Sequence, residues 1–218
     1  MDRTTTSDDL SPSAGDIPTD RKKIAAIESV NALRQFDRVV EIIDESIRPE
    51  ADFKLRPSLL SELNKLATEG TYLHPGVLRF GNVTINGSEH KPPPPDHVPP
   101  LVDEMCEYVN DSPDKSPIHL AAYLLWRINW IHPYGDGNGR TARATSYLVL
   151  SIRLGFRIPG ANTIPEQIQV DKQPYYVALE AADAAYRNGT IDVSELEALL
   201  GQYLATQLLD VHHKAIGG

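Results

Sequence analysis

Most of the side chains that could do chemistry in this chain lie within twelve consecutive positions, 132–143 (HPYGDGNGRTAR). They include a histidine, an aspartate, three glycines and two arginines. An imidazole suits a general base, a carboxylate is a usual ligand of Mg²⁺, and arginines bind phosphate. The apolar runs on both sides predict two buried helices that hold this polar loop between them. The combination favours a site for a phosphate-containing ligand over an ordinary surface turn.

The order of residues in the loop supports a phosphate site. Residues 137–139 (Gly-Asn-Gly) lead directly into the second predicted helix. The first turn of a helix presents free N–H groups and the positive end of the helix dipole, and glycine lets a ligand approach the backbone closely. Arg140 and Arg143 are three positions apart and share a helix face, so together they could clamp a polyphosphate. Asp136 is the hard-oxygen ligand nearby and predicts a Mg²⁺ ion shared with phosphate oxygens.

His132 follows the most apolar run of the chain, residues 117–131. Beside a nucleotide and Mg²⁺, a histidine could deprotonate an incoming hydroxyl for attack on phosphorus. A histidine at the end of a helix could instead merely satisfy the last carbonyl groups. The neighbouring Asp136, Asn138 and Arg143 favour the catalytic interpretation.

Composition limits the other classes of function. The chain has 218 residues, a net charge of -9 and a single cysteine, Cys106. An acidic balance argues against general nucleic-acid binding, and one cysteine can form no internal disulfide. We found no signal peptide and no apolar stretch of membrane-spanning length, so we expect a cytoplasmic protein that does not insert into membranes. Self-association stays open.

Hydrophobic periodicity predicts a mainly α class with one small β-hairpin. Residues 1–20 are polar and predict a disordered tail. We expect two helical runs within 21–50, a core over 51–210 and a C-terminal tail over 211–218. Alternation in 77–86 and the Asn-Gly turn predict a hairpin flap, and six prolines in 91–100 predict an extended connector or, alternatively, a ligand of a proline-binding module. The core helices are expected at 57–68, 101–110, 117–131, 139–154, 174–187 and 192–210.

Other glycine-rich motifs fit less well. A P-loop requires Lys-Ser/Thr after its last glycine, where this chain has Arg140-Thr141. A dinucleotide-binding GxGxxG that began at Gly135 would need glycine at Arg140, and no strand precedes it. An EF-hand that began at Asp136 would need glycine at Thr141 and more acids.

The loop resembles the signature of the Fic (Fido) family, HPFx(D/E)GNGRxxR, with Tyr134 in place of the usual phenylalanine. The similarity extends to 76–98, which resembles the family's flap and its proline-rich exit, and to 175–183, which resembles a helix that encloses adenine. It covers roughly residues 24–209. The resemblance implies a Fic-type helical bundle with a small hairpin flap.

The resemblance also implies an activity, namely AMPylation, in which AMP passes from Mg²⁺-ATP to a Tyr, Thr or Ser hydroxyl of a protein, either a separate target or the chain itself. His132 would be the base and Asp136 the Mg²⁺ ligand. ATP would be bound by Gly137, Asn138, Gly139, Arg140, Thr141, Arg143, Tyr175 and Asp183, with Arg143 on the γ-phosphate. The flap residues Gly87, Ser88, Glu89 and His90 would align the target. The family often has asparagine at the position of Asp183.

Family members carry an inhibitory helix, (S/T)xxxE(G/N), whose glutamate pairs with the second arginine of the motif. Residues 24–29 (IAAIES) fit its glutamate with Glu28, whereas Ile24 and Ser29 differ from the pattern. Glu28 is therefore expected to inhibit by pairing with Arg143, unless it is an ordinary solvated helix residue. Residues 46–50 match the first half of the pattern, but Pro49 counts against them.

We therefore expect an autoinhibited, Mg²⁺-dependent protein adenylyltransferase. Within enzymes, the alternatives are transfer of UMP, phosphocholine or phosphate, and removal of AMP. Outside enzymes, the alternative is a nucleotide-binding regulatory module. The intact His132, Asp136 and Arg143 favour an enzyme.

Overall fold

A computed structural model describes residues 17–85 and 87–215, with the backbone alone for 212–215. Within these residues the chain is helical, and it has no strand apart from an isolated bridge between Leu78 and Tyr134. The prediction of a mainly α fold is thus confirmed. The helices are α1 (Arg21–Ser46), α2 (Pro57–Thr68), α3 (Val98–Asn110), α4 (Pro117–Ile131), α5 (Asn138–Leu154), α6 (Ile164–Val170), α7 (Gln173–Arg187) and α8 (Ser194–Ala215), and a 3-10 turn, η1 (Pro95–His97), precedes α3. Of the predicted N-terminal tail, residues 1–16 lie outside the described part of the chain.

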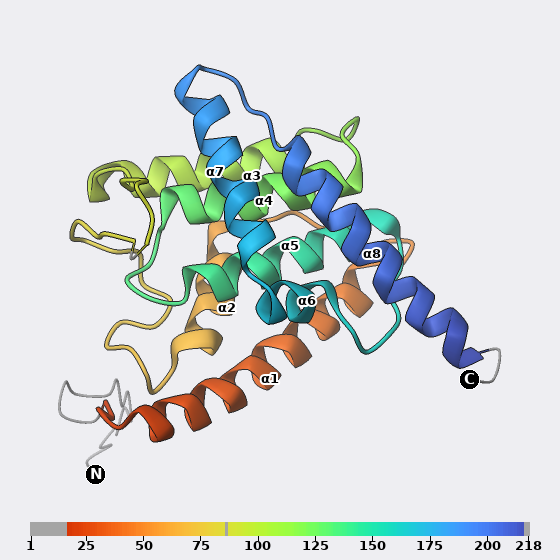
Figure 1. Ribbon diagram of the computed structural model, residues 1–218, viewed down its shortest axis with the longest axis horizontal. Helices are drawn as coiled ribbons and strands as arrows, with labels where there is room; N and C mark the ends of the chain where they lie inside the picture. Colours follow the sequence, from red (N-terminus) through yellow and green to blue (C-terminus); the bar gives the residue numbers. More distant parts are fainter. Residues whose placement is uncertain (1–16, 86, 216–218) are drawn as a thin grey trace, which may run out of the picture.

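Helices α4 and α5 form the centre of the molecule, and the others pack around them (Figure 1). Every residue from Leu120 to Ile128 is buried, as is every residue from Ala144 to Ser151. Neighbouring helices therefore cover both segments on every side. The loop between them, 132–137, is therefore held at both ends by the rigid core.

Helix α1 is a single helix of 26 residues, whereas the sequence predicted two runs. Asp20 caps its N-terminus by accepting hydrogen bonds from the N–H groups of Lys22 and Lys23. The residues at the expected break, 31–34, include no glycine or proline, so nothing interrupts the helix. Helix α1 runs along one side of the molecule and packs against α2 and α5 (Figure 1).

The structure corrects the prediction for 91–100, whose second half is helical. Residues 95–97 form η1, and α3 begins at Val98. Pro99 and Pro100 then occupy the first turn of α3, where a missing N–H group removes no intrahelical hydrogen bond. Helix α8 also runs to Ala215, five residues beyond the predicted end.

The expected hairpin at 77–86 is not present in its described residues. Asn86, the first residue of the predicted turn, lies outside them. Instead, the Leu78–Tyr134 bridge ties the start of this segment to the loop after α4. No helix in the described ranges combines the length and the apolarity that crossing a bilayer requires.

Candidate functional site

The loop 132–137 has a defined conformation that begins at the end of α4. His132 closes that helix in the left-handed region, with φ 50°, and its N–H donates to the Ile128 carbonyl at 2.9 Å. Asn138, at the start of α5, accepts a hydrogen bond from the Tyr134 N–H at 2.9 Å and donates one to the Tyr134 carbonyl at 2.8 Å. These two hydrogen bonds to the backbone of Tyr134 hold the loop in its closed conformation. The predicted contact of Asn138 with phosphate can therefore come only from its backbone.

At two glycines of the loop, neighbouring side chains leave no space for a Cβ atom. A Cβ atom on Gly135 would lie 1.8 Å from the Tyr72 hydroxyl, and one on Gly137 would lie 2.5 Å from Thr68. Gly137 also has φ 78°, a conformation that favours glycine. Beside it, Asn64 of α2 donates to the Asp136 carbonyl at 2.9 Å and to the Thr141 hydroxyl at 3.2 Å. The C-terminal half of α2 thus holds the loop through Asn64.

We expect Gly137→Ala to destabilise the protein by about 2–5 kcal/mol, the sum of left-handed strain and overpacking. Gly189→Ala is the matched control, because Gly189 has φ 80° but open space around it. It should lose only the strain, about 1–2 kcal/mol. Denaturant unfolding of both variants measures the difference, and equal losses would show that the contact with Thr68 is unimportant.

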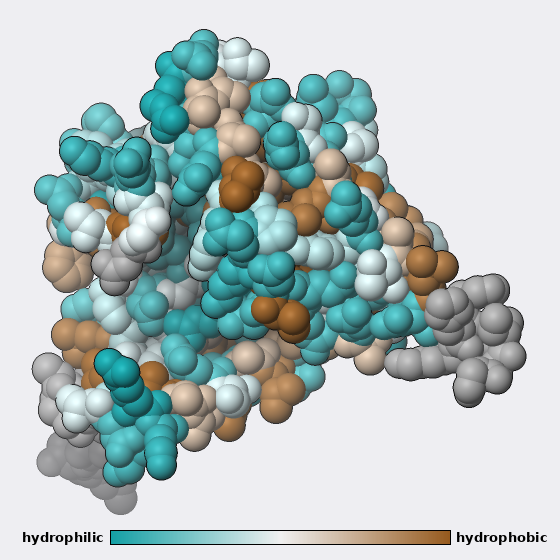
Figure 2. Space-filling model, in the orientation of Figure 1, coloured by the Kyte–Doolittle hydropathy of each residue, from teal (hydrophilic) through white to brown (hydrophobic). Residues whose placement is uncertain are grey.

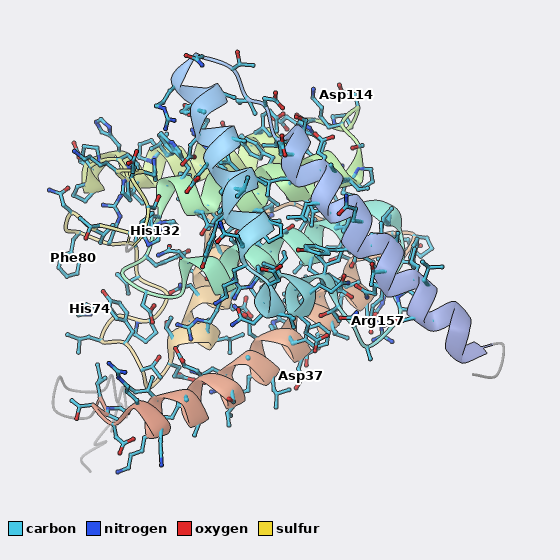
Figure 3. The ribbon with its side chains drawn as sticks, viewed as in Figure 1. Asp37, His74, Phe80, Asp114, His132 and Arg157 are labelled. Atoms are coloured by element: carbon cyan, nitrogen blue, oxygen red, sulfur yellow. The ribbon has the colours of Figure 1, made fainter. Side chains whose placement is uncertain are left out.

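His132 lies where the 70–93 segment crosses the end of α4 (Figure 3). Burial lowers its pKa to about 4, and the electrostatic effects of Arg79 and His90 add to this shift. The Asn129 carbonyl and Asp136 act against it. Within the described residues its buried Nδ1 makes no hydrogen bond of good geometry. The imidazole is therefore neutral at physiological pH, which is the form a general base needs.

Glu28 pairs with Arg140, not with Arg143 as predicted. An oxygen of Glu28 lies 2.8 Å from one terminal nitrogen of Arg140, and Asp136 lies 2.9 Å from the other. Three residues turn a helix by about 300°, so Arg140 and Arg143 differ in direction by roughly 60°. Arg140 faces α1, and Arg143 lines the cavity on the side of α7.

That cavity has a volume of about 410 Å³ and lies between the segment 85–90, the ends of α4 and α5, and α7. On the face drawn in Figure 2 the surface is hollowed beside α7. Gly139 and Arg143 of α5 are among its lining residues, and Arg143 gives it a positive charge. Burial lowers the pKa of Arg143, and its side chain has no ion pair within the described part of the chain. A desolvated arginine beside a helix N-terminus is well placed to receive an anion.

The cavity also has aromatic and polar lining residues. Tyr175 is buried, and its hydroxyl accepts a hydrogen bond from Asn129 at 2.8 Å. The carboxylate of Asp183 accepts one from the Trp126 indole, also at 2.8 Å, and its second oxygen lies 3.8 Å from Nδ1 of His90. Tyr175 and Asp183, predicted as nucleotide contacts, thus line one cavity together with Gly139 and Arg143 of α5. His132 and Asp136 are not among its lining residues.

The predicted flap residues divide into two groups. Gly87, Ser88 and His90 line the cavity, whereas Glu89 is exposed and does not. His90 donates through Nε2 to the Trp130 carbonyl at 2.8 Å, since a carbonyl oxygen can only accept. This contact holds the flap residues 87–90 against the end of α4.

The predicted metal ligand Asp136 stands alone. Nowhere in the described ranges do three or more His, Cys, Asp or Glu side chains gather around one point. Asp136 is half exposed, and one of its carboxylate oxygens pairs with Arg140. The other carboxylate oxygen can still coordinate a metal ion. One carboxylate oxygen fits Mg²⁺ only as a partial ligand set that phosphate oxygens and water complete.

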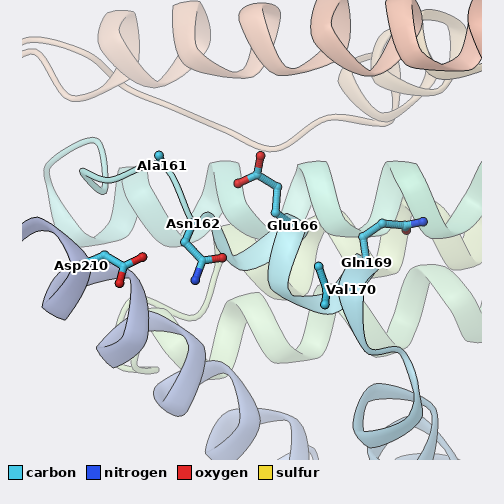
Figure 4. A pocket seen from close by; sticks show the side chains of 6 residues that line it. All are labelled: Ala161, Asn162, Glu166, Gln169, Val170 and Asp210. Carbon is cyan, nitrogen blue, oxygen red and sulfur yellow. The ribbon is translucent and has the colours of Figure 1, made fainter.

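A larger hollow, of about 540 Å³, lies on a different part of the surface, between α6 and α8 (Figure 4). Its ionisable lining residues are the acids Glu166 and Asp210. Glu166 is already used, because it forms the capping box of α6 with Thr163. An acidic hollow without a base or a cation is a poor site for a phosphate ligand.

Two residues that build the site, Asn64 and Arg79, were not predicted from the sequence. Asn64 is fully buried on the apolar face of α2, between Leu60 and Ala67. A polar residue at an apolar position of a helix indicates a buried hydrogen bond, so the sequence did contain a sign of its role. Arg79 is also buried, with its guanidinium on backbone carbonyls of the loop. Nothing in the spacing of residues 77–86 distinguished it. Thr141, predicted to bind ATP, uses both its hydroxyl and its N–H to hold the Gly137 carbonyl, so that role stays a prediction.

Residues 54–150 match the Fic/DOC family. Among curated proteins, the chain is 26% identical over 160 residues to "Protein adenylyltransferase Fic" of Drosophila persimilis, a match that covers 72% of this chain and 30% of the relative. It is 39% identical over 85 residues to a Fido domain-containing protein of Dictyostelium discoideum, with 39% of this chain and 54% of the relative covered. The chain thus matches about a third of the length of the first and about half of the second.

Solved structures share the fold. A Fic family protein from Desulfovibrio desulfuricans has a TM-score of 0.67 at 20% identity, with 89% of this chain and 59% of that one covered. A fragment of Fic-1 from C. elegans has a TM-score of 0.66 at 19% identity, with 94% and 56% covered. At such identities the likeness extends to the fold.

Proposed function

We propose that this chain, whose residues 54–150 match the Fic/DOC family, is a protein adenylyltransferase, which transfers AMP from ATP to a hydroxyl group of a protein. The observation that carries the proposal is the cavity that Gly139, Arg143, Tyr175 and Asp183 line together. Its volume of about 410 Å³ suits a nucleotide-sized ligand. The curated relative from Drosophila persimilis bears the name of this activity.

The triphosphate is proposed to lie along the N-terminus of α5. The N–H groups of Asn138, Gly139 and Arg140 belong to the first turn, which has no intrahelical acceptors for them. Arg143 adds a positive charge that has no competing ion pair within the described residues. Asp136, through its free oxygen, would hold a Mg²⁺ ion together with phosphate oxygens, and bound Mg²⁺ would offset the charge that develops on the leaving pyrophosphate.

The nucleoside is proposed to lie against α7 and the flap. Tyr176 and Leu179 offer apolar surface, and Asp183 offers a carboxylate oxygen that can accept a hydrogen bond from an amino group of a base. The indole of Trp126 fixes the orientation of that carboxylate. These contacts support a purine with an exocyclic amino group, as adenine has.

His132 is proposed to start the reaction. It removes the proton from the target hydroxyl, whose oxygen then bonds to the α-phosphorus of ATP while the bond to the bridging oxygen of pyrophosphate breaks. The low pKa of His132 in the free protein keeps the ring unprotonated and ready to accept this proton. The target segment is proposed to align along residues 87–90, whose backbone can pair with an extended peptide.

Glu28 is proposed to restrain the enzyme. Arg140 is held by Glu28 and by Asp136 at the same time, so the arginine and the metal ligand are both engaged. Binding of Mg²⁺-ATP must compete with this triad for Asp136 and Arg140. The resting protein is therefore expected to have low activity.

Transfer from ATP labelled at either the α- or the γ-phosphorus tests the proposal. Purified protein with Mg²⁺ should label itself or a protein in a lysate from α-labelled ATP and not from γ-labelled ATP. Labelling from the γ-position would indicate phosphate transfer, and labelling from α-labelled UTP or from CDP-choline would indicate the other Fic-type transfers. ATP binding without any labelling, even after Glu28→Gln, would support a nucleotide-binding regulatory module. Loss of AMP from a previously modified protein would support de-AMPylation.

A further inference from the structure

Arg79 has an unusual environment for an arginine. The residue is 7% exposed, and its guanidinium donates hydrogen bonds to four backbone carbonyls. Nε reaches the His132 carbonyl at 2.7 Å, and the terminal nitrogens reach those of Ile131 at 3.3 Å, Pro93 at 2.5 Å and Gly81 at 3.0 Å. The backbone N–H of Arg79 donates to the Pro133 carbonyl at 2.9 Å. One residue thus binds three consecutive carbonyls, 131–133, around the candidate base.

These carbonyls need a partner because α4 ends there. The last carbonyl groups of a helix have no intrahelical donor, and a cation at that end also interacts favourably with the helix dipole. A left-handed residue commonly closes a helix, but that residue is usually glycine. Here it is His132, with φ 50°, and no other non-glycine residue in the described ranges has a positive φ. Such a conformation persists only where surrounding contacts enforce it.

We propose that Arg79 is the positioning residue of His132, which it holds in the left-handed conformation that aims the imidazole at the reacting hydroxyl. This inference rests on the proposed transfer reaction. Arg79 does not touch the reacting atoms, since all its hydrogen bonds go to backbone carbonyls. It acts through the geometry of the end of α4.

The same guanidinium connects His132 with the flap. Gly81 and Pro93 stand at the two ends of the segment that includes the flap residues 87–90, and both carbonyls bind Arg79. One rigid, planar guanidinium binds both ends of that segment and the backbone of His132, so it fixes the position of the segment relative to the base. A target hydroxyl aligned by the flap would therefore arrive at a fixed distance from the imidazole.

Arg79 also contributes charge. The charged and titratable groups that act on His132 are Arg79, His90 and Asp136, together with the Asn129 carbonyl. Arg79 and His90 disfavour the imidazolium form, whereas Asp136 and Asn129 favour it. A methionine at position 79 would remove both the charge and the hydrogen bonds, while a lysine would keep the charge and lose the fork of donors. The two variants separate geometry from charge.

The test compares Arg79→Lys and Arg79→Met with the native protein and with Arg153→Met. Arg153 is the matched control, because it also binds a helix-terminal carbonyl, that of Val109 at 2.6 Å, away from the cavity. For each protein we would measure kcat and KM for ATP, ATP affinity, and the titration of His132 by NMR on carbon-13-labelled histidine, with His132→Ala to assign its signal. Hydrogen exchange of residues 81–93 reports the flap.

We expect both Arg79 variants to lower kcat by at least about tenfold, with KM for ATP within about twofold, because a misplaced base slows the chemical step and leaves nucleotide binding intact. The pKa of His132 should rise from about 4 in Arg79→Met and stay low in Arg79→Lys. Exchange in 81–93 should become faster in both variants, and Arg153→Met should change none of these quantities.

The inference is wrong if either Arg79 variant lowers kcat no more than Arg153→Met does, or raises KM for ATP instead. Should Arg79→Met fail to fold, Arg79→Lys carries the kinetic comparison. The titration and hydrogen exchange need no activity, so they separate the two proposals. Native protein that transfers no AMP would refute the proposed function, whereas an unchanged His132 titration in Arg79→Met, with unchanged exchange in 81–93, would refute the role of Arg79.

Discussion

Replacing His132 with alanine is expected to lower the rate of AMP transfer by about two to four orders of magnitude, the usual contribution of a general base. Its buried Nδ1 makes no hydrogen bond of good geometry within the described residues, so removal of the side chain should leave the fold and ATP affinity nearly unchanged. Transfer assays and calorimetric ATP titrations measure the two quantities. The Glu28→Gln background should be used, because the native protein is expected to be restrained.

The pH dependence of the reaction is a second test of His132 as the general base. The base must be unprotonated, and burial lowers its pKa to about 4 in the free protein, so kcat/KM should be flat through neutral pH and fall only near pH 4. Bound phosphates add negative charge beside the ring, which favours its protonated form. The acid limb of kcat should therefore lie at a higher pH than that of kcat/KM. Substantial transfer by His132→Ala would remove this residue as the base.

Replacing Glu28 with glutamine is expected to raise the rate of AMP transfer by about tenfold. A partly buried charge-assisted pair is worth about 1–2 kcal/mol, between the exposed and buried limits, and about 1.4 kcal/mol corresponds to tenfold. Glutamine keeps the helix propensity of glutamate but releases the charge that holds Arg140. Initial rates at Mg²⁺-ATP concentrations well below KM measure the effect, and KM for ATP should fall by a similar factor because the contact competes with ATP.

Glu41→Gln is the control for this variant. Glu41 is also on α1 and also pairs with an arginine, Arg38, at 3.2 Å, but away from the loop. Its replacement should leave the rate unchanged. A rise of the same size in both variants would indicate a general effect of charge on α1, and no rise in Glu28→Gln would mean that the contact with Arg140 does not restrain transfer.

The parts of the fold that follow from local pattern could be predicted well. Helix α2 has the predicted bounds, 57–68, because Pro57 suits a first turn and its apolar spacing is regular. Helix α4 also has the predicted bounds, because Pro117 suits a first turn and most of its residues are apolar. Helix α6 was not predicted, because seven residues are too few to show helical periodicity. Thr163 and Glu166 nevertheless have the spacing of a capping box, which indicates the start of a helix.

The tertiary contacts of the site could not be predicted from local pattern. Spacing places Arg140 and Arg143 on one helix, but which of them meets Glu28 depends on how α1 crosses α5, and the structure selects Arg140. The hairpin prediction used the alternation in 77–86, whereas the segment is held by Arg79 and the bridge to Tyr134 in place of strand pairing. Local pattern located the loop, and packing decided its contacts.

Intact-mass spectrometry tests the central claim most directly. Glu28→Gln and the double variant Glu28→Gln/His132→Ala would each be incubated with Mg²⁺-ATP, alone and with a lysate. The account predicts that Glu28→Gln adds AMP to itself or to a lysate protein, and that the double variant adds none although it still binds ATP. AMP addition by the double variant, or none by Glu28→Gln under either condition, would contradict it.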